Sequence, residues 1–426
     1  MIRSLFKLSS LLLGVALLLT GHGLQLAIVP LRSELMGWTA TQVGMLSSIY
    51  FIGFVIGCFS VPRIVARIGH IRAFASLTTI MTASILIFPI ADFLPAWMLL
   101  RMLTGIAIAG LYLVIESWLN EQVGKEERGG VLAAYTVIVL AGLACGQLLL
   151  NLAPVEGDRL FMLAAIYIVL AALPVCLTGS SHPRAIPQAS FSPMLVIKTS
   201  RAATTGSVVS GMVSGAIYGL GPLFGLQIGM EVMAISFMMS LAITGGALSQ
   251  LPLGRMSDKI DRRIILLICM LAGAGVSILA LIMPVSTVPA IMFLFGAAVL
   301  PIYAISLALA NDNAGDGQFL EIGTGLLMMN ALGSIVGPLL ASQLIDRLGP
   351  EYFFVYQLVV LILGALLVIL MIRTKPAATG PHSDFKLATT AAGQAALELD
   401  PRVDEDTLEP DTQVDENIDD PNNNAD

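Results

Sequence analysis

Charged residues are scarce in this chain, and their scarcity excludes a water-soluble fold. Only 12% of the 426 positions are charged and 56% are hydrophobic, whereas an average soluble protein is charged at about a quarter of its positions. Long apolar stretches recur from Leu8 to Ile372, and a helix needs about 20 apolar residues to cross a bilayer. Since backbone polar groups in lipid must be paired within each segment, the sequence predicts an all-α membrane protein.

Cysteine and histidine are equally few, with four of each. The cysteines stand alone in separate apolar segments, where Cys behaves as a small hydrophobic residue, so neither a disulfide framework nor a zinc site is implied. No Gly-rich loop is present to hold phosphates, which argues against an ATP-driven pump on this chain. We therefore expect no cofactor, no metal and no nucleic-acid partner.

Apolar length, with breaks at Pro, Gly and charged residues, predicts twelve spanning helices in two sets of six. The first run lacks a small-residue cleavage pattern and is interpreted as a span rather than a signal peptide. A polar, Pro-interrupted linker, residues 179 to 203, separates a first bundle (1 to 178) from a second (204 to 375). The predicted spans are 8 to 30, 42 to 62, 73 to 91, 95 to 117, 130 to 151, 160 to 178, 204 to 228, 232 to 253, 264 to 284, 288 to 310, 320 to 342 and 351 to 372.

The basic residues give this map an orientation. Of the 22 Lys and Arg residues, 18 fall on one side, three (Arg32, Arg159 and Arg347) fall on the other, and Arg101 lies inside a span. By the positive-inside rule we expect both termini in the cytoplasm, with the protein in a bacterial inner membrane. One helix too many or too few would scramble this asymmetry, which supports the even count.

The two sets of six helices also resemble each other in sequence. Residues 141 to 149 (AGLACGQLL) resemble residues 332 to 340 (LGSIVGPLL) at an offset of 191, and the basic turn at 67 to 72 resembles residues 259 to 263 at an offset of 192. Two unrelated segments that agree on one offset indicate duplicated halves.

The final segment, residues 376 to 426, differs in kind from the rest. It holds 13 acidic and two basic residues, so it carries a formal charge of −11 while the rest of the chain is +4. Low hydrophobicity and acidic runs are typical of a disordered, solvated tail. A docking role for this tail is the alternative.

The loop after the eighth span carries the first family resemblance. It reads Gly254-Arg-Met-Ser-Asp258-Lys-Ile-Asp-Arg262-Arg263, which closely resembles the signature loop of the major facilitator superfamily. The resemblance implies two six-helix pseudo-repeats and a gating loop, in which the Asp faces a helix end of the other half in one conformation.

The matching loop after the second span is a degraded copy. It keeps Arg67, Gly69 and Arg72, but Pro62 stands for the first Gly and Ala66 for the Asp. A carboxylate therefore remains only in the second-half loop. The alternative is that the arginines of both loops are ordinary topology determinants.

The fourth and fifth spans indicate which branch of the superfamily the chain resembles. Arg101, Gly105 and Gly110 follow a pattern that looks like the superfamily's fourth helix, and the string from Val114 to Leu149 is similar to the YcaD-like branch. The fifth span has Gly146-Gln147 where drug and proton antiporters have Gly-Pro, which argues against a multidrug antiporter.

Arg101 and His22 are the first candidates for a transport site. A charge inside the membrane costs roughly 3 kcal/mol on insertion scales, so Arg101 needs a function or a partner. His22 lies about 21 Å into the first span at ~1.5 Å per residue, and Arg101 lies at nearly the same depth. If both spans line a cavity, as in the family, the two flank one ligand with Gln25 a turn away, and His22 suits proton coupling. A structural tie for Arg101 and a neutral, hydrogen-bonded His22 are the alternatives.

Further candidates follow from helical spacing. Arg101, Gly105, Ile108, Tyr112 and Glu116 share one face of the fourth span, which we expect to look into the cavity. Glu116 is either a protonatable site or an interfacial anchor.

The second half offers its own polar stripe along the seventh span, which includes Ser214 and Tyr218. Tyr303 on the tenth span is the counterpart of Tyr112. Small polar residues also let helices pack closely, so packing is the alternative for each Ser. The eleventh span contributes Asn330, and the remaining polar candidates are Ser207, Ser210, Gln227, Ser334, Gln147 and Asn151.

These features predict a monomeric secondary transporter that moves a small solute by alternating access, with proton coupling. A transporter-like sensor or scaffold that acts through the acidic tail is the second hypothesis. A membrane-embedded enzyme would need convergent His, Asp or Cys pairs at one depth, and the few ionisable groups do not supply them.

The predicted topology can be tested by cysteine labelling from outside the cell, in a background without the native cysteines. A cysteine at Gly157 should react with an impermeant reagent, because the loop between the fifth and sixth spans is expected outside. A cysteine at Ser190, in the linker, should be protected. The reverse pattern would contradict the topology.

Overall fold

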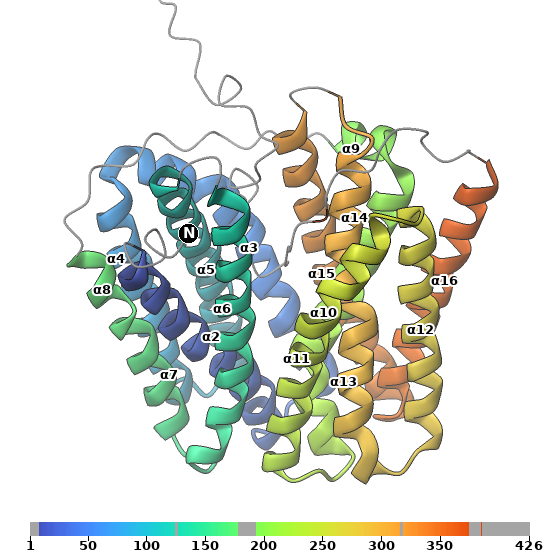
Figure 1. Cartoon of the computed structure of the whole chain (residues 1–426). Helices are drawn as coiled ribbons and strands as arrows, with labels where there is room; N and C mark the ends of the chain where they lie inside the picture. Colours follow the sequence, from blue (N-terminus) through green and yellow to red (C-terminus); the bar gives the residue numbers. More distant parts are fainter. Residues whose placement is uncertain (1–7, 124–126, 178–192, 316–317, 375–384, 386–426) are drawn as a thin grey trace, which may run out of the picture.

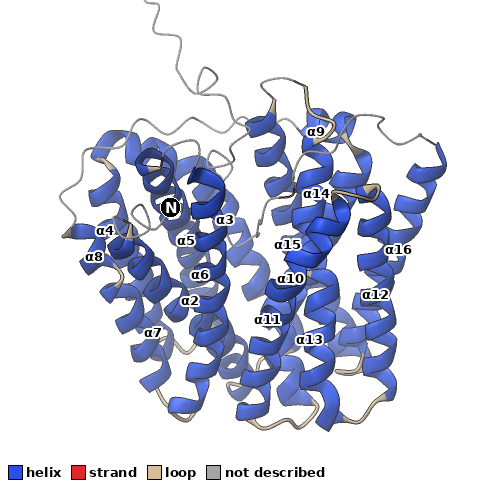
Figure 2. Ribbon diagram, in the orientation of Figure 1, coloured by secondary structure: helices blue, strands red, loops and turns tan. Residues whose placement is uncertain are grey.

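The computed structural model describes residues 8–123, 127–177, 193–315, 318–374 and 385. In this part of the chain every regular element is a helix (Figure 2), and twelve helical segments are long and apolar enough to cross a membrane. The all-α class and the twelve predicted spans are confirmed. The acidic tail lies outside the described residues apart from Phe385, and so does most of the linker.

Within the described residues the spanning helices follow one another as an up-and-down series, with three 3-10 helices among them and four spans built from more than one piece. Their bounds are α2 (Ser9–Leu35), α3 (Ala40–Ile68), α4 (His70–Ile87), η1 (Phe88–Ile90), α5 (Leu94–Gln122), α6 (Arg128–Leu148), η3 (Leu149–Leu152), α7 (Arg159–Leu170), α8 (Ala172–Cys176), α9 (Pro193–Thr199), α10 (Arg201–Gln227), α11 (Val232–Ser257), α12 (Arg262–Ile282), η4 (Val285–Thr287), α13 (Val288–Val299), α14 (Pro301–Asn311), α15 (Phe319–Leu348) and α16 (Tyr352–Thr374).

Several helices run past the predicted spans, because backbone hydrogen bonding continues where the apolar run stops. The span predicted at 42 to 62 is α3, which continues to Ile68, and the span predicted at 320 to 342 is α15, which continues to Leu348. Gly69 (φ +82°) and Gly349 (φ +116°) follow these ends, and glycine adopts such positive φ angles without strain. The apolar run therefore locates a span but underestimates its helix.

The linker is shorter than predicted. Residues 193 to 199 form α9, and α10 already begins at Arg201, where the Ser200 side chain caps it by accepting a hydrogen bond from the Ala203 N–H. Residues 179 to 192 lie outside the described part of the chain.

The helices form two bundles, α2 to α8 and α9 to α16, which lie side by side in Figure 1. We call the end at which α2 begins and α16 ends the termini face, and the opposite end the far face. The glycines of the repeated segment allow close packing of two helices in both bundles. Gly146 of α6 packs on the backbone of α2 at Thr20 and Leu24, and Gly337 of α15 packs on the backbone of α10 at Met212.

Hydrogen bonds join the two bundles toward the far face. Ser48 Oγ of α3 donates to the Ile335 carbonyl of α15 at 2.6 Å. Asn151 Nδ2 donates to Ser236 Oγ of α11 at 2.8 Å, and Gln227 at the end of α10 donates to Glu34 at the end of α2 at 3.2 Å.

Asp346 makes the most specific of these contacts. Its two carboxylate oxygens each lie 2.7 Å from a backbone nitrogen of the first turn of α3, at Ala40 and Thr41, and accept hydrogen bonds from both. Amide groups at a helix N-terminus are unpaired within the helix and attract negative charge. A side chain of the second bundle thus caps a helix of the first.

Replacing Asp346 by Asn should loosen the far face, because an amide brings no charge and only one acceptor oxygen to the start of α3. The effect is expected to be about 1 kcal/mol, or roughly fivefold in the ratio of closed to open molecules. Spin labels are placed at Asp92 and Ser286, at the far face of the two bundles. The fraction of molecules with a long distance between the two labels should increase.

Asp158→Asn is the matched control, since Asp158 lies on the same face and pairs with Arg32 of its own bundle at 3.9 Å. It should leave the distance distribution unchanged. An Asp346→Asn protein with the parent distribution would contradict the role of this contact.

Candidate functional site

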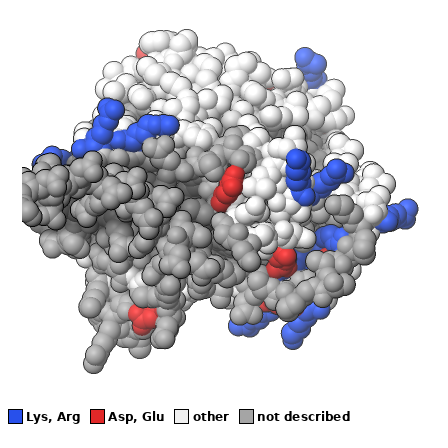
Figure 3. Space-filling view, turned by 90° about the horizontal axis from the view of Figure 1, so that it is seen from above, with Lys and Arg blue, Asp and Glu red and all other residues white. Residues whose placement is uncertain are grey.

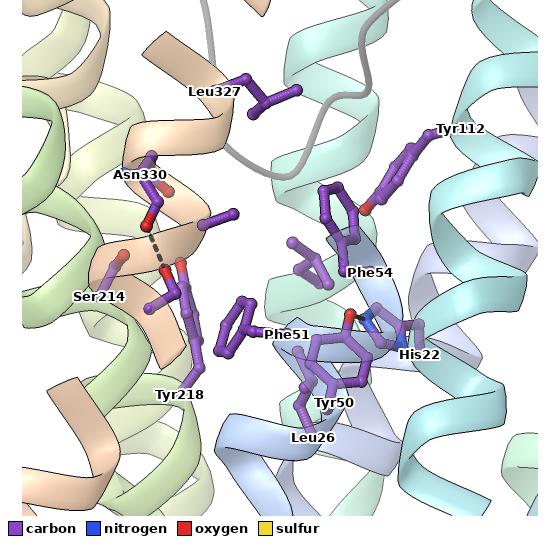
Figure 4. A pocket seen from close by; sticks show the side chains of 13 residues that line it. His22, Leu26, Tyr50, Phe51, Phe54, Tyr112, Ser214, Tyr218, Leu327 and Asn330 are labelled. Carbon is purple, nitrogen blue, oxygen red and sulfur yellow. Dashed lines mark hydrogen bonds between the residues drawn. The ribbon is translucent and has the colours of Figure 1, made fainter. Parts of the chain in front are cut away.

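A cavity lies between the two bundles, roughly halfway along the spanning helices (Figure 4). Helices α2, α3, α5 and α6 form one wall, and α10 and α15 form the other. The lining residues are His22, Leu26, Tyr50, Phe51, Phe54, Tyr112, Leu143, Ser214, Tyr218, Leu327, Asn330, Ala331 and Ser334.

A chain of polar side chains forms the deepest part of the first-bundle wall. Tyr50 Oη and His22 Nε2 are 3.0 Å apart and share a hydrogen bond, visible in Figure 4. His22 Nδ1 lies 3.4 Å from Gln25 Oε1, one turn further along α2. The structure therefore brings the predicted pair His22 and Gln25 together, and Tyr50 joins them to α3.

Arg101 lies behind this wall rather than on the cavity surface. Its guanidinium carbon is 4.4 Å from the centre of the Tyr50 ring, and its Nε donates to the Leu46 carbonyl at 3.4 Å. The side chain is 3% exposed. Tyr50 thus stands between Arg101 and the cavity, in a cation–π contact.

The charge of Arg101 is not neutralised by a neighbouring side chain. Among the described residues no carboxylate forms an ion pair with it, and its buried Nη1 has no hydrogen-bond partner. A buried charge without a partner is costly in a membrane protein and marks a functional site. Gln25 Nε2, close by, is likewise buried without a partner.

The predicted residues of the fourth span have different surroundings from one another. Tyr112 lines the cavity, whereas Gly105 packs on the backbone of α3 at Tyr50 and Phe54. Glu116 is fully buried and accepts a hydrogen bond from Tyr135 Oη of α6 at 2.9 Å. The five-residue face of this helix therefore points mainly at neighbouring helices, and only its Tyr reaches the cavity.

In the second bundle, Ser214, Tyr218 and Asn330 line the cavity as predicted for a transport site, but Tyr303 does not. Tyr303 is buried within α14, just beyond the break in the tenth span at Pro301. It is the repeat counterpart of Tyr112, but it is not among the residues that line this cavity.

Hydrogen bonds turn the polar groups of this second wall toward its own backbone. Ser214 Oγ donates to the Ser210 carbonyl at 2.7 Å, and Asn330 Nδ2 donates to the Ser207 carbonyl at 3.1 Å. Ser334 Oγ lies 3.0 Å from the Asn330 carbonyl. The Asn330 bond crosses from α15 to α10, and Ser334 Oγ also reaches the Gly211 carbonyl of α10 at 3.2 Å. The packing role considered for the small polar residues is therefore present here.

The second-half gating loop is a network of charges on the termini face. Arg262 is fully buried and its Nε donates to Asp312 at 2.7 Å, while its Nη2 lies 3.2 Å from Asp258. Asp258 also accepts a hydrogen bond from the Phe385 N–H at 2.9 Å, and the Phe385 ring covers Gly254. Here Asp258 faces its own bundle and the tail, while Arg263 pairs with Asp261 at 2.7 Å.

The first-half loop lacks such a network. Arg67 and Arg72 are exposed, and Gly69 holds the turn between α3 and α4 with its positive φ. The neighbouring buried His70 instead contacts Ser117 Oγ of α5 at 3.2 Å.

Three aromatic residues of α3 line the cavity without having been predicted: Tyr50, Phe51 and Phe54. Tyr50 and Phe54 are one helical turn apart, and a polar aromatic residue inside a span was a signal that could have found them. Asp346 was missed too, because its partner on α3 is about 305 positions away in the sequence.

Comparisons with known proteins agree with this architecture. The family model of the Major Facilitator Superfamily matches residues 11–318 and 203–401. The uncharacterised MFS-type transporter YcaD of Salmonella typhimurium is 30% identical over 349 residues, which cover 81% of this chain and 90% of that protein.

Two solved structures show the same fold. The nucleoside transporter NupG has a TM-score of 0.71 at 14% identity, covering 86% of this chain and 99% of its own. A bacterial homologue of the human lysosomal transporter Spinster, in an inward-facing and occupied conformation, has a TM-score of 0.71 at 15% identity, covering 87% and 97%.

Asp258→Asn should impair transport several-fold more than any substitution at Ala66, tested as Ala66→Asn. The reason is that Asp258 holds the buried Arg262, and breaking a buried charge network is costly, whereas Ala66 is exposed and carries no charge. Initial uptake rates in vesicles, corrected for the amount of inserted protein, measure the difference. Equal tolerance at the two positions would remove the gating role of Asp258.

Proposed function

Because the chain belongs to the major facilitator superfamily, we propose that this multi-pass membrane transporter is a proton-coupled secondary carrier of a small solute. The observation that supports this most is the cavity enclosed between two similar bundles. Residues from both bundles line it, as a site for alternating access requires. A carrier of this kind binds its solute at the interface and exposes it to either side by rocking one bundle against the other.

We further propose that the far face is the outside and that the structure is closed toward it. Asp346, Ser48 and Asn151 all join the bundles near that face. The termini face carries the described basic turns, and Lys and Arg side chains outnumber acidic ones around its visible rim (Figure 3). By the positive-inside rule such a face is cytoplasmic, and the membrane is then a bacterial inner membrane.

His22 is the group we propose for proton coupling. It lines the cavity, it is held by Tyr50 and Gln25, and Arg101 lies behind the same wall. A proton on His22 would place a second positive charge near Arg101, which like-charge repulsion disfavours unless an anion is present. Proton binding and solute binding are linked by this arrangement, as coupling requires.

His22→Gln should leave downhill exchange of solute intact and abolish accumulation driven by a pH gradient. Glutamine keeps a hydrogen-bonding side chain beside Tyr50 but cannot take up a proton at neutral pH. The measurement is uptake into proteoliposomes with and without an imposed pH gradient, after a metabolite library has identified a transported solute.

His70→Gln is the matched control, because His70 is also buried but lies outside the cavity. It should accumulate solute as the parent protein does. If His22→Gln accumulates solute equally well, the proton is carried elsewhere and Glu116 is the next group to test. Absence of exchange for every solute in the library would contradict the carrier itself.

A further inference from the structure

We propose that the cavity selects a small organic monoanion with an aromatic or similarly flat apolar body, such as an aromatic carboxylate. The carboxylate faces the wall made by His22, Tyr50 and Arg101, and the ring lies among the aromatic side chains. This inference rests on the proposed function, in which the cavity is the transport site.

The buried charge of Arg101 is the first observation that favours an anion. Arg101 is buried, unpaired with any described carboxylate, and has a free Nη1. The nearest acidic residue on its own helix, Glu116, is fifteen positions away, which is about 22 Å along α5. Glu116 instead lies one helical turn from Tyr112, away from Tyr50. In a water-poor interior the charge of Arg101 acts over several ångströms, so an anion is attracted to the Tyr50 end of the cavity and a cation is repelled there.

The hydrogen-bonding groups of the same wall fit an acid group. Tyr50 and His22 both line the cavity and already share one hydrogen bond. Gln25 Nε2 and Arg101 Nη1 are buried donors without partners immediately behind them. Carboxylates accept hydrogen bonds and donate none. When His22 Nε2 donates to Tyr50, the Tyr50 hydroxyl is free to donate to an acid group in the cavity, and Arg101 acts on that group through its charge from behind Tyr50.

The rest of the cavity is built for a flat apolar body. Five aromatic rings line it, from Tyr50, Phe51, Phe54, Tyr112 and Tyr218. Figure 4 shows Phe51 of α3 and Tyr218 of α10 facing each other across the space between the bundles. Aromatic side chains favour another ring in an offset or edge-to-face arrangement.

The second-bundle wall excludes strongly hydroxylated solutes. Ser214, Asn330 and Ser334 already direct hydrogen bonds at backbone carbonyls of their own bundle. A sugar or another polyol would therefore find few free donors for its hydroxyl oxygens on this wall, which disfavours its binding. The first bundle therefore contacts the acid group of the solute, and both bundles contact its apolar body.

The test measures binding of matched probes to the full-length protein in detergent, by thermal stabilisation and calorimetry. Three aromatic acids (phenylacetate, cinnamate and indole-3-acetate) are compared with their neutral amides, with phenethylamine as the cation and acetate as the anion without a ring. We expect at least one aromatic acid to bind about tenfold or more tightly than its amide, and neither phenethylamine nor acetate to compete. Amides that bind as well as their acids, or no binding by any acid, would overturn the proposal.

Variants test separately whether Arg101 determines the preference for an acid and whether Phe51 determines the binding of the ring. Arg101→Gln should reduce the preference for acid over amide to near unity without lowering the melting temperature of the unliganded protein, and Arg101→Lys should keep part of it, since a point charge replaces a planar fork. Phe51→Ala should weaken the binding of aromatic acids several-fold. Arg201→Gln, an exposed arginine at the start of α10, is the control and should bind like the parent. An unchanged acid preference in Arg101→Gln would overturn the role of Arg101.

These outcomes are separable from failure of the carrier proposal. If the vesicles exchange neutral or cationic solutes but no aromatic acid binds, the carrier stands and the proposed solute class falls. If aromatic acids bind selectively while no solute is exchanged, the cavity is a binding site for such acids and the carrier falls.

Discussion

Close backbone contact at glycine is the constraint on which this structure depends. In lipid, apolar side chains gain little by leaving one apolar environment for another, so helices associate through packing and hydrogen bonds. Gly146 brings α6 onto α2, Gly337 brings α15 onto α10, and Gly105 brings α5 onto α3. A side chain at any of these positions would collide with neighbouring backbone, which cannot move aside easily. The helices of each bundle are thereby fixed to one another. Glycines also bring the bundles together, because Gly44 of α3 packs against Ser342 of α15 and Gly219 of α10 packs against Ser47 of α3.

The charged and polar groups of the cavity are distributed unequally between the two bundles. The first bundle holds the buried charge of Arg101 and the hydrogen-bonded pair of His22 and Tyr50. The second bundle contributes a neutral wall, in which Asn330 and Ser334 of α15 bond backbone carbonyls of α10. A solute between them contacts two surfaces of different character, each fixed within a rigid body. Movement of one bundle relative to the other therefore changes the site as a whole, rather than one side chain at a time.

The sequence predicted the number and order of the spans because apolar length is a local property. It underestimated α3 and α15, since helix hydrogen bonding extends beyond apolar residues. His22, Tyr112, Ser214, Tyr218 and Asn330 were expected at the site and line the cavity, whereas Tyr303 was expected there and does not line it. Depth follows from counting residues, but rotation follows from packing between helices distant in sequence. The same reason hid the place of Tyr50 in front of Arg101.

The capping of α3 by Asp346 has a mechanical consequence. Helix α3 also carries its own cap, in which Thr39 and Gln42 bond each other's backbone. When the carboxylate leaves, the helix keeps this internal cap, and only the amides of Ala40 and Thr41 must find water at the membrane surface. The first turn of α3 therefore need not unravel for the far face to part. Release of Asp346 therefore exchanges two protein hydrogen bonds for two hydrogen bonds to water and leaves the secondary structure of α3 intact.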